Sequence, residues 1–262
     1  MLPPYTTYLI DLDGVVYRGE TLVPGAKDFI SWLERTGKKY LFPTNNSFAS
    51  EAQVVEKLNR LGIPAGKEHV LGAGQASVRN IARRFPGAHV FVIGEQPLID
   101  MVIAYNLPLA REDASDADVV LVGLDRTITY QKLTAAVLAV RRGAHFIAIN
   151  RDPLLPVAGG FTAGTGTMVA AIEAGSGVTP QVIGKPQPAL LQEALNLLGS
   201  TPEETVMIGD GLEIDIKAGK AAGTHTMLVL SGKDSRESLA RSPIKPDLVY
   251  ENLGAALADV LE

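Results

Sequence analysis

The chain has 262 residues and 46% of them are hydrophobic, which is enough to bury the core of one large domain or of two modest ones. Its 24 Lys and Arg residues against 29 Asp and Glu residues give a formal charge of -5, so it lacks the basic field that holds a nucleic-acid backbone nonspecifically. The absence of cysteine excludes disulfides, thiolate catalysis and cysteine-ligated zinc, and no apolar run approaches the ~20 residues that a bilayer span needs.

Short apolar runs of strand length recur along the chain, with helical patterns between them. This alternation predicts an α/β fold of parallel sheets with helical crossovers. The first helix is expected from about Pro24 to Gly37, and the second begins at a capping box of Ser50 and Gln53 and ends before Gly62. The predicted strands are Tyr8–Ile10, Tyr40–Phe42, His89–Ile93, Val119–Leu124, His145–Ile149, Val206–Ile208 and Thr226–Leu230.

Two acids, Asp11 and Asp13, directly follow the first predicted strand, and Gly14 comes after them. An extended segment that turns at the glycine brings both carboxylates to one end of the sheet, where a cation or a reaction would explain their proximity. A capped turn is the plain structural alternative. A calcium loop is excluded, because Val16 and Leu22 stand where its sixth-position glycine and twelfth-position glutamate belong.

The strand that ends at Phe42 is followed by four small polar residues, Thr44, Asn45, Asn46 and Ser47. Ligands of open parallel sheets bind outside the carboxyl ends of the strands, so we expect these residues to face the same site as the two acids. An ordinary turn and helix start is the structural alternative.

The middle of the chain has its own alternation of strands and helices, which predicts an inserted domain. The small-residue stretches 71–74 and 174–180 mark its ends, and we expect domains at 1–80, 81–178 and 179–262. Asn150, Arg151 and Asp152 follow one of its strands and are candidates for recognising a substrate. The glycine-rich stretch 159–167 is no nucleotide-binding loop, because Thr165 stands where lysine is required, and we assign it no cofactor.

The last part of the chain supplies Lys185 after the run 182–184, and Asp210 and Asp215 after the strand Val206–Ile208. Singly, each could be a surface lysine, a loop acid or a charge at a helix start. Jointly, polar sets at four strand ends favour phosphoryl transfer, which needs in-line positioning and neutralisation of charge.

In that chemistry Asp11 is the candidate nucleophile, and Asp13 is the general acid for the leaving group and then the base for water. The Asp11 side chain, the Asp13 backbone carbonyl and Asp210 are the expected ligands of Mg2+. We expect Asp215 to orient Lys185 or a metal-bound water.

The phosphoryl oxygens need hydrogen-bond donors and a compensating charge. Thr44, Asn45, Asn46 and nearby backbone amides are the expected donors, and Lys185 is the expected cation.

The motifs resemble those of haloacid dehalogenase (HAD) superfamily phosphatases of the NagD and p-nitrophenylphosphatase type. The resemblance rests on Asp11-Leu12-Asp13-Gly14-Val15, Thr44-Asn45-Asn46-Ser47, Gly184-Lys185-Pro186 and the segment 209–216, in that order along nearly the whole chain. It implies a Rossmann-like core and an inserted α/β cap of the C2 type, as in subfamily IIA, because the long insertion follows the second motif. It also implies that 150–152 is the Asn-x-Asp element of the cap.

Two positions depart from the family pattern. Pro43 stands where relatives often have an aliphatic residue, and Ile214 stands where threonine is common. Proline is tolerable at a strand terminus, and neither change removes a charged participant.

We therefore expect a magnesium-dependent phosphatase of small phosphomonoesters such as sugar phosphates, nucleoside monophosphates or phosphoglycolate. Phosphotransfer to another metabolite and a receiver-like regulatory module are the alternatives. Since the first residues also lack a secretory signal, we expect a soluble, cytoplasmic protein without nucleic-acid or membrane partners, and a homo-oligomer stays open.

Overall fold

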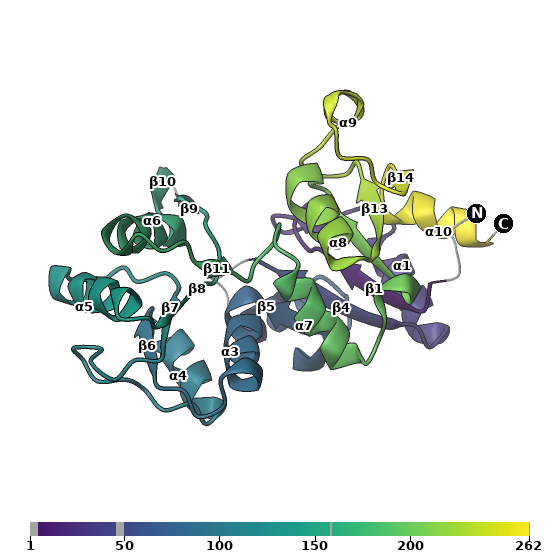
Figure 1. The fold of residues 1–262 in the computed structure, drawn as a ribbon. Coiled ribbons are helices and arrows are strands. Elements are labelled where there is room, and N and C mark those ends of the chain that lie inside the picture. The colour runs from purple at the N-terminus through teal and green to yellow at the C-terminus, as the bar shows by residue number, and fades with distance from the viewer. Residues whose placement is uncertain (1–4, 46–49, 158, 262) are drawn as a thin grey trace. The chain divides into compact units, whose positions relative to one another are not determined.

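The computed structural model describes residues 5–45, 50–157 and 159–261 (Figure 1). The chain divides into two compact units. The core unit comprises residues 1–72 and 185–262, and the inserted unit comprises residues 73–184. In the part of the chain that the structure describes, no helix combines the length and the apolar character needed to cross a membrane.

The limits of these units differ from the domain boundaries expected after residues 80 and 178. Helix α3 (Ala73–Arg84) runs without interruption through the first expected boundary. Strand β11 (Gln181–Val182) lies beyond the second, yet it pairs with β8 (His145–Ala148) of the inserted unit. The small-residue stretch 71–74 therefore contains the first chain crossing, after residue 72, whereas the stretch 174–180 ends before the second crossing, after residue 184.

The core unit is built on a six-stranded sheet in the order β14-β13-β12-β1-β4-β5, and every neighbouring pair is parallel. All four residues of β1 are buried, as expected for a central strand covered on both faces. The strands are β1 (Thr7–Ile10), β4 (Lys39–Thr44), β5 (Val70–Gly72), β12 (Thr205–Gly209), β13 (His225–Val229) and β14 (Leu248–Tyr250), and a small antiparallel hairpin joins β2 (Tyr17–Arg18) to β3 (Thr21–Leu22).

The helices of the core unit bury apolar side chains on this sheet. Phe29 and Trp32 of α1 both pack edge-on against Tyr8 of β1, and these aromatic side chains lie in one buried cluster with Phe42 and Leu58. The helices are α1 (Ala26–Arg35), α2 (Glu51–Arg60), α7 (Ala189–Leu198), α8 (Lys217–Ala222), α9 (Arg236–Arg241) and α10 (Leu253–Leu261), with short helical turns at Lys67–His69, Pro202–Glu204 and Leu212–Ile216.

The inserted unit has its own four-stranded parallel sheet in the order β11-β8-β7-β6 and its own buried core around Phe91, Val120 and Phe146. Its remaining strands are β6 (Val90–Ile93), β7 (Val119–Val122) and the hairpin of β9 (Leu154–Val157) with β10 (Gly160–Ala163), and its remaining helices are α4 (Gln96–Ala104), α5 (Tyr130–Arg141) and α6 (Thr165–Ser176). The α/β fold with parallel sheets is thus confirmed, and each predicted strand is found to within two residues at either end.

The predicted helix signals are also confirmed. Ser50 accepts a hydrogen bond from the backbone N–H of Gln53, and the Gln53 side chain accepts one from the backbone N–H of Ser50. Gly62 follows the end of α2 with a φ of 82°, a left-handed conformation that glycine adopts without steric cost.

Candidate active site

The end of strand β1 fixes the position of Asp11. Its backbone N–H donates to the Ile208 carbonyl at 2.9 Å, which continues the parallel register of β1 with β12 and brings Asp11 beside the end of β12. The chain then turns at Gly14, whose φ is 79° and whose N–H donates to the Tyr17 carbonyl at 2.8 Å. This turn ends the strand and presents Asp13, which is exposed.

Three carboxylates meet at this end of the sheet. Asp11, Asp210 and Asp215 each have an oxygen within 4.8 Å of the other two. Asp210 directly follows β12. Asp215 returns to the same place because the turn Leu212–Ile216 is helical and the Asp215 carboxylate accepts the Gly211 N–H at 3.1 Å. Asp11 and Asp210, which were expected to hold a metal, are thus brought together with Asp215.

Lys185 lies between two of these acids. Its Nζ is 2.5 Å from Asp11 Oδ1 and 2.7 Å from Asp215 Oδ1, and only 4% of the residue is exposed. Asn45 holds the Lys185 backbone, because its Nδ2 donates to the Lys185 carbonyl at 2.7 Å and its Oδ1 accepts the Lys185 N–H at 2.8 Å. The second and third motifs are therefore joined directly.

The strand that precedes Lys185 belongs to another sheet than expected. The run 182–184 lies in the expected domain 179–262, outside the expected inserted domain, but β11 pairs with β8 in the inserted unit. Lys185 itself belongs to the core unit and reaches the acids through its long side chain.

When it is fully ionised, this cluster carries an excess of negative charge. Burial, opposed by Lys185 and reinforced by Asp215 and Asp210, raises the pKa of Asp11 to about 7. Burial alone would lower the pKa of Lys185, but the two neighbouring carboxylates raise it, so the lysine is charged. Three carboxylates against one ammonium leave two negative charges when all are ionised, and a divalent cation would neutralise them.

The donor set fits such an ion. Mg2+ prefers hard oxygen ligands, and carboxylates supply them. Both oxygens of Asp215 accept hydrogen bonds, Oδ1 from Lys185 and Oδ2 from Gly211. Asp11 and Asp210 accept the bonds described here through one oxygen each, so they are the carboxylates better placed to coordinate. In the described residues the Asp13 carboxylate does not belong to this cluster, which keeps its side chain available for other chemistry.

Asp13 has a neighbouring lysine. Although Asp13 is exposed as a residue, partial burial of its carboxyl group raises its pKa, and the charge of Lys57 on helix α2 acts against that rise. The Lys57 ammonium lies 3.7 Å from the centre of the Tyr17 ring, so it is held over the hairpin that follows Asp13. A carboxyl group with a raised pKa stays protonated to higher pH, as a proton donor must.

The expected phosphate-binding residues are placed only in part. Thr44 is the last residue of β4, opposite Gly72 of β5, and it is 6% exposed. Asn45 bonds to Lys185 as described above. Asn46, also expected to bind phosphate, lies outside the described residues.

The three candidates of the inserted unit follow β8 but differ from one another. Asn150 is 3% exposed and its Oδ1 accepts the Asp152 N–H at 3.1 Å, so its side chain shapes the loop. Arg151 is exposed and pairs with Glu173 of α6. These residues belong to the inserted unit, whereas the acids and Lys185 belong to the core unit.

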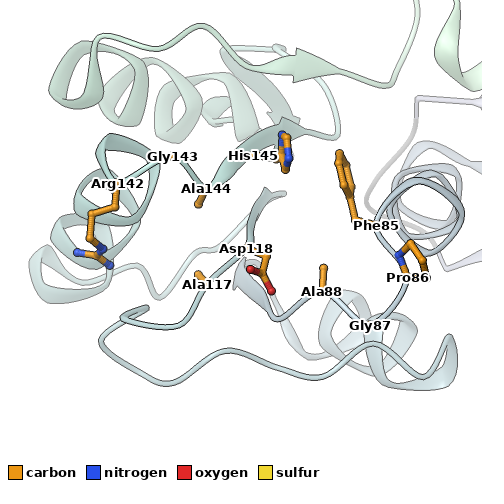
Figure 2. A pocket seen from close by; sticks show the side chains of 10 residues that line it. All are labelled: Phe85, Pro86, Gly87, Ala88, Ala117, Asp118, Arg142, Gly143, Ala144 and His145. Carbon is orange, nitrogen blue, oxygen red and sulfur yellow. The ribbon is translucent and has the colours of Figure 1, made fainter.

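One pocket lies elsewhere. A cavity of about 480 Å³ in the inserted unit is lined by residues such as Phe85, Asp118 and His145, which Figure 2 shows in close-up. Its lining comes from the segments that lead into β6, β7 and β8, which is the amino end of that sheet. Since ligands of parallel sheets bind at the carboxyl ends, we do not take it for the active site.

Sequence reasoning did not single out the segment 231–234 after β13. Its Lys233 backbone N–H donates to Asp210 at 2.8 Å. The one feature of the sequence that could have pointed to this segment is its position directly after the predicted strand Thr226–Leu230.

Known proteins resemble the chain over nearly its whole length. Residues 8–108 match the model of the haloacid dehalogenase-like hydrolases and residues 182–256 match that of the HAD-hydrolase-like proteins. The 5'-nucleotidase YutF of Bacillus subtilis is 38% identical over 95% of this chain and 96% of its own, and an acid sugar phosphatase of Staphylococcus aureus is 36% identical over 98% of each.

Solved structures agree with this result. The p-nitrophenyl phosphatase from Archaeoglobus fulgidus matches with a TM-score of 0.88 and 35% identity, over 98% of this chain and 100% of that one. NagD from E. coli K-12 matches with a TM-score of 0.87 and 30% identity, over 95% of this chain and 97% of that one.

Proposed function

The chain belongs to the haloacid dehalogenase-like hydrolases, as a NagD-like phosphoric monoester hydrolase, and on this premise we propose that it hydrolyses small phosphomonoesters through an aspartyl-phosphate at Asp11 with the help of Mg2+. The observation that carries the proposal is the convergence of Asp11, Asp210 and Lys185 at the carboxyl end of β1. A carboxylate nucleophile, a cation-binding acid and an ammonium group are what transfer of an anionic phosphoryl group to a carboxylate requires.

The reaction has two steps. An Asp11 carboxylate oxygen forms a bond to phosphorus while the bond from phosphorus to the ester oxygen breaks, and Asp13 gives its proton to the departing alkoxide. Asp13, now a carboxylate, takes a proton from water, whose oxygen attacks the phosphorus of the aspartyl-phosphate. Inorganic phosphate leaves, and Asp11 and protonated Asp13 are restored.

The other residues of the site bind the phosphoryl group and the cation. Thr44, Asn45 and Asn46 are proposed to donate hydrogen bonds to phosphoryl oxygens, with Lys185 as the point charge. Mg2+ would be held by Asp11, Asp210 and the Asp13 backbone carbonyl, and it would screen the anionic nucleophile from the anionic substrate. Asp215 fixes the position of the Lys185 ammonium through their contact at 2.7 Å.

The names of the relatives support a proposed substrate class. Their names include a 5'-nucleotidase, an acid sugar phosphatase and a p-nitrophenyl phosphatase, so we propose nucleoside monophosphates, sugar phosphates or related metabolites such as phosphoglycolate. Asn150, Arg151 and Asp152 of the inserted unit are the proposed recognition residues for the leaving group. Arg151 and Asp152 are exposed, and the Arg151 guanidinium is the member of this set that suits an anionic group.

The test is release of phosphate from p-nitrophenyl phosphate with Mg2+. Asp11→Asn should lower turnover by roughly a thousandfold or more, because the amide is not a competent nucleophile. Asp28→Asn is a matched control, since Asp28 is an exposed acid on helix α1 of the same unit. Unchanged turnover in Asp11→Asn would remove the proposed nucleophile.

A further inference from the structure

A fifth segment of chain, which the four motifs do not include, holds Asp210. This segment, residues 231–234, lies between β13 and helix α9. The backbone N–H of Lys233 donates to Asp210 Oδ2 at 2.8 Å, and the backbone N–H of Asp234 donates to the Asp210 backbone carbonyl at 3.0 Å. Two consecutive residues therefore fix the side chain and the backbone of Asp210 at once.

Asp234 also bonds to the other side of the Asp210 loop. Its Oδ2 accepts the backbone N–H of Leu212 at 2.7 Å. Leu212 opens the helical turn that carries Asp215. Asp234 is thus hydrogen-bonded both to Asp210 and to Leu212, the first residue of this turn.

Ser231 connects the same segment to the first motif. Its Oγ donates to the Gly14 carbonyl at 2.7 Å, and the residue is only 8% exposed. Gly14 makes the turn that follows Asp13. One short segment is therefore bonded to the parts of the chain that carry the first and the fourth motifs.

Close packing of two glycines completes this support. A Cβ atom at Gly232 would lie 1.9 Å from Asp210 Oδ2, and a Cβ at Gly14 would lie 2.0 Å from the same oxygen. No side chain fits at either place unless Asp210 moves. Since Lys233 and the two glycines fix one carboxylate oxygen, they also set the direction of the other.

We propose that the segment 231–234 is a positioning element for the cation site, which holds the Asp210 carboxylate in place against the Gly14 turn and thereby sets the affinity for Mg2+. Ser231 and Asp234 are positioning residues, because their contacts are to protein groups and not to substrate. The inference rests on the proposed function and deepens it by naming what keeps the cation ligand in register.

The experiment is calorimetric titration of the full-length protein with Mg2+ in the absence of substrate. Ser231→Ala and Asp234→Ala should each weaken binding by roughly tenfold or more, the usual effect of losing support for a metal ligand. Asp234→Asn keeps an acceptor oxygen for the Leu212 N–H and should restore nearly wild-type affinity. Gly232→Ala should weaken binding further, because its methyl group displaces Asp210.

Ser77→Ala is the matched control. Ser77 is buried on helix α3 of the inserted unit, and its Oγ donates to the Ala73 carbonyl at the same 2.7 Å. It should lose stability as Ser231→Ala does but keep wild-type Mg2+ affinity.

Wild-type affinity in both Ser231→Ala and Asp234→Ala would overturn the inference. An equal loss in Asp234→Asn and Asp234→Ala would also overturn it, since the negative charge and not the hydrogen bond would then set the affinity. If Ser231→Ala fails to fold, the two Asp234 variants decide. Absence of Mg2+ binding in the wild-type protein would overturn both this inference and the metal of the proposed function. The failures described above, in which the wild-type protein still binds Mg2+, would overturn this inference alone.

Discussion

Lys185 shows how one side chain can serve both the fold and the chemistry. A buried ammonium is costly unless it is paired, and here Asp11 and Asp215 both contact it. In the proposed function, the pairing with Asp11 also places a positive charge where the phosphoryl group would arrive. The lysine buried between two acids would then serve both these ion pairs and the binding of an anion.

Asp13 is the residue whose protonation state should govern the alkaline side of the pH dependence, whereas the ionisation of Asp11 should govern the acid side. Because burial raises the pKa of Asp13, the protonated acid persists to higher pH than an ordinary carboxyl group, and it is lost as the pH rises through that raised value. Hydrolysis of an alkyl phosphate, whose leaving group needs a proton, should fall on this alkaline side. Initial rates against pH for wild type and Asp13→Asn test this, and the variant should be slow and lack the alkaline fall.

The comparison with p-nitrophenyl phosphate separates this role from a structural one. Its leaving group needs little protonation, so release of nitrophenolate in the first turnover should suffer less in Asp13→Asn than release of an alkyl alcohol. An equal loss for both substrates would count against Asp13 as the acid.

At the scale of elements, the loop after β7 illustrates how a buried acid can stabilise a connection. Asp125 has a side chain that is 1% exposed, and it accepts bonds from Lys132 Nζ at 2.6 Å and from the Thr127 N–H and Oγ1 at 2.9 Å each. Burial alone would raise the pKa of Asp125, but these bonds outweigh burial and hold the pKa below its ordinary value of 3.8. The loop is thus tied to the first turns of α5.

Asp125→Asn should lower the free energy of unfolding by about 1–3 kcal/mol at neutral pH, because a buried partner of Lys132 loses its charge. A lowered pKa contributes stability that is present above the unfolded value and lost as the pH falls through the folded value. The difference between wild type and variant in urea unfolding should therefore shrink below a pH of about 3.8. A difference that is constant with pH would contradict this.

For the whole molecule, the division into two units makes a prediction about folding. Residues 73–184 have their own sheet and their own buried core, and the chain enters and leaves this unit once each. The isolated segment should fold cooperatively without phosphatase activity, which circular dichroism during thermal unfolding and a phosphate assay would measure. A featureless melt would show that its core needs the rest of the chain.

Much of this architecture could be predicted because its signals are local. Apolar runs marked the strands, and the ends of β1, β4 and β12 were readable as the places of Asp11, Thr44 and Asp210, since parallel strands gather their carboxyl ends at one edge. The capping box at Ser50 is likewise a pattern of neighbours along the chain.

What could not be predicted depends on contacts between distant segments. Gly74 belongs to the small-residue stretch 71–74 that was expected to mark a domain end, but it lies within α3 and faces Leu98 and Met101. A strand as short as β11 does not reveal which sheet it joins. The segment 231–234 has the composition of an ordinary turn, and only the fold shows that it holds Asp210.

The most direct test of the account is mass spectrometry of acid-quenched Asp13→Asn after mixing with p-nitrophenyl phosphate and Mg2+. With no base to activate water, the phosphorylated enzyme should accumulate, and one phosphoryl group should be found on the peptide that contains Asp11. The double variant Asp11→Asn with Asp13→Asn should carry none. A phosphoryl group on any other residue, or steady turnover by Asp13→Asn with its Asp11 peptide unmodified, would contradict the account.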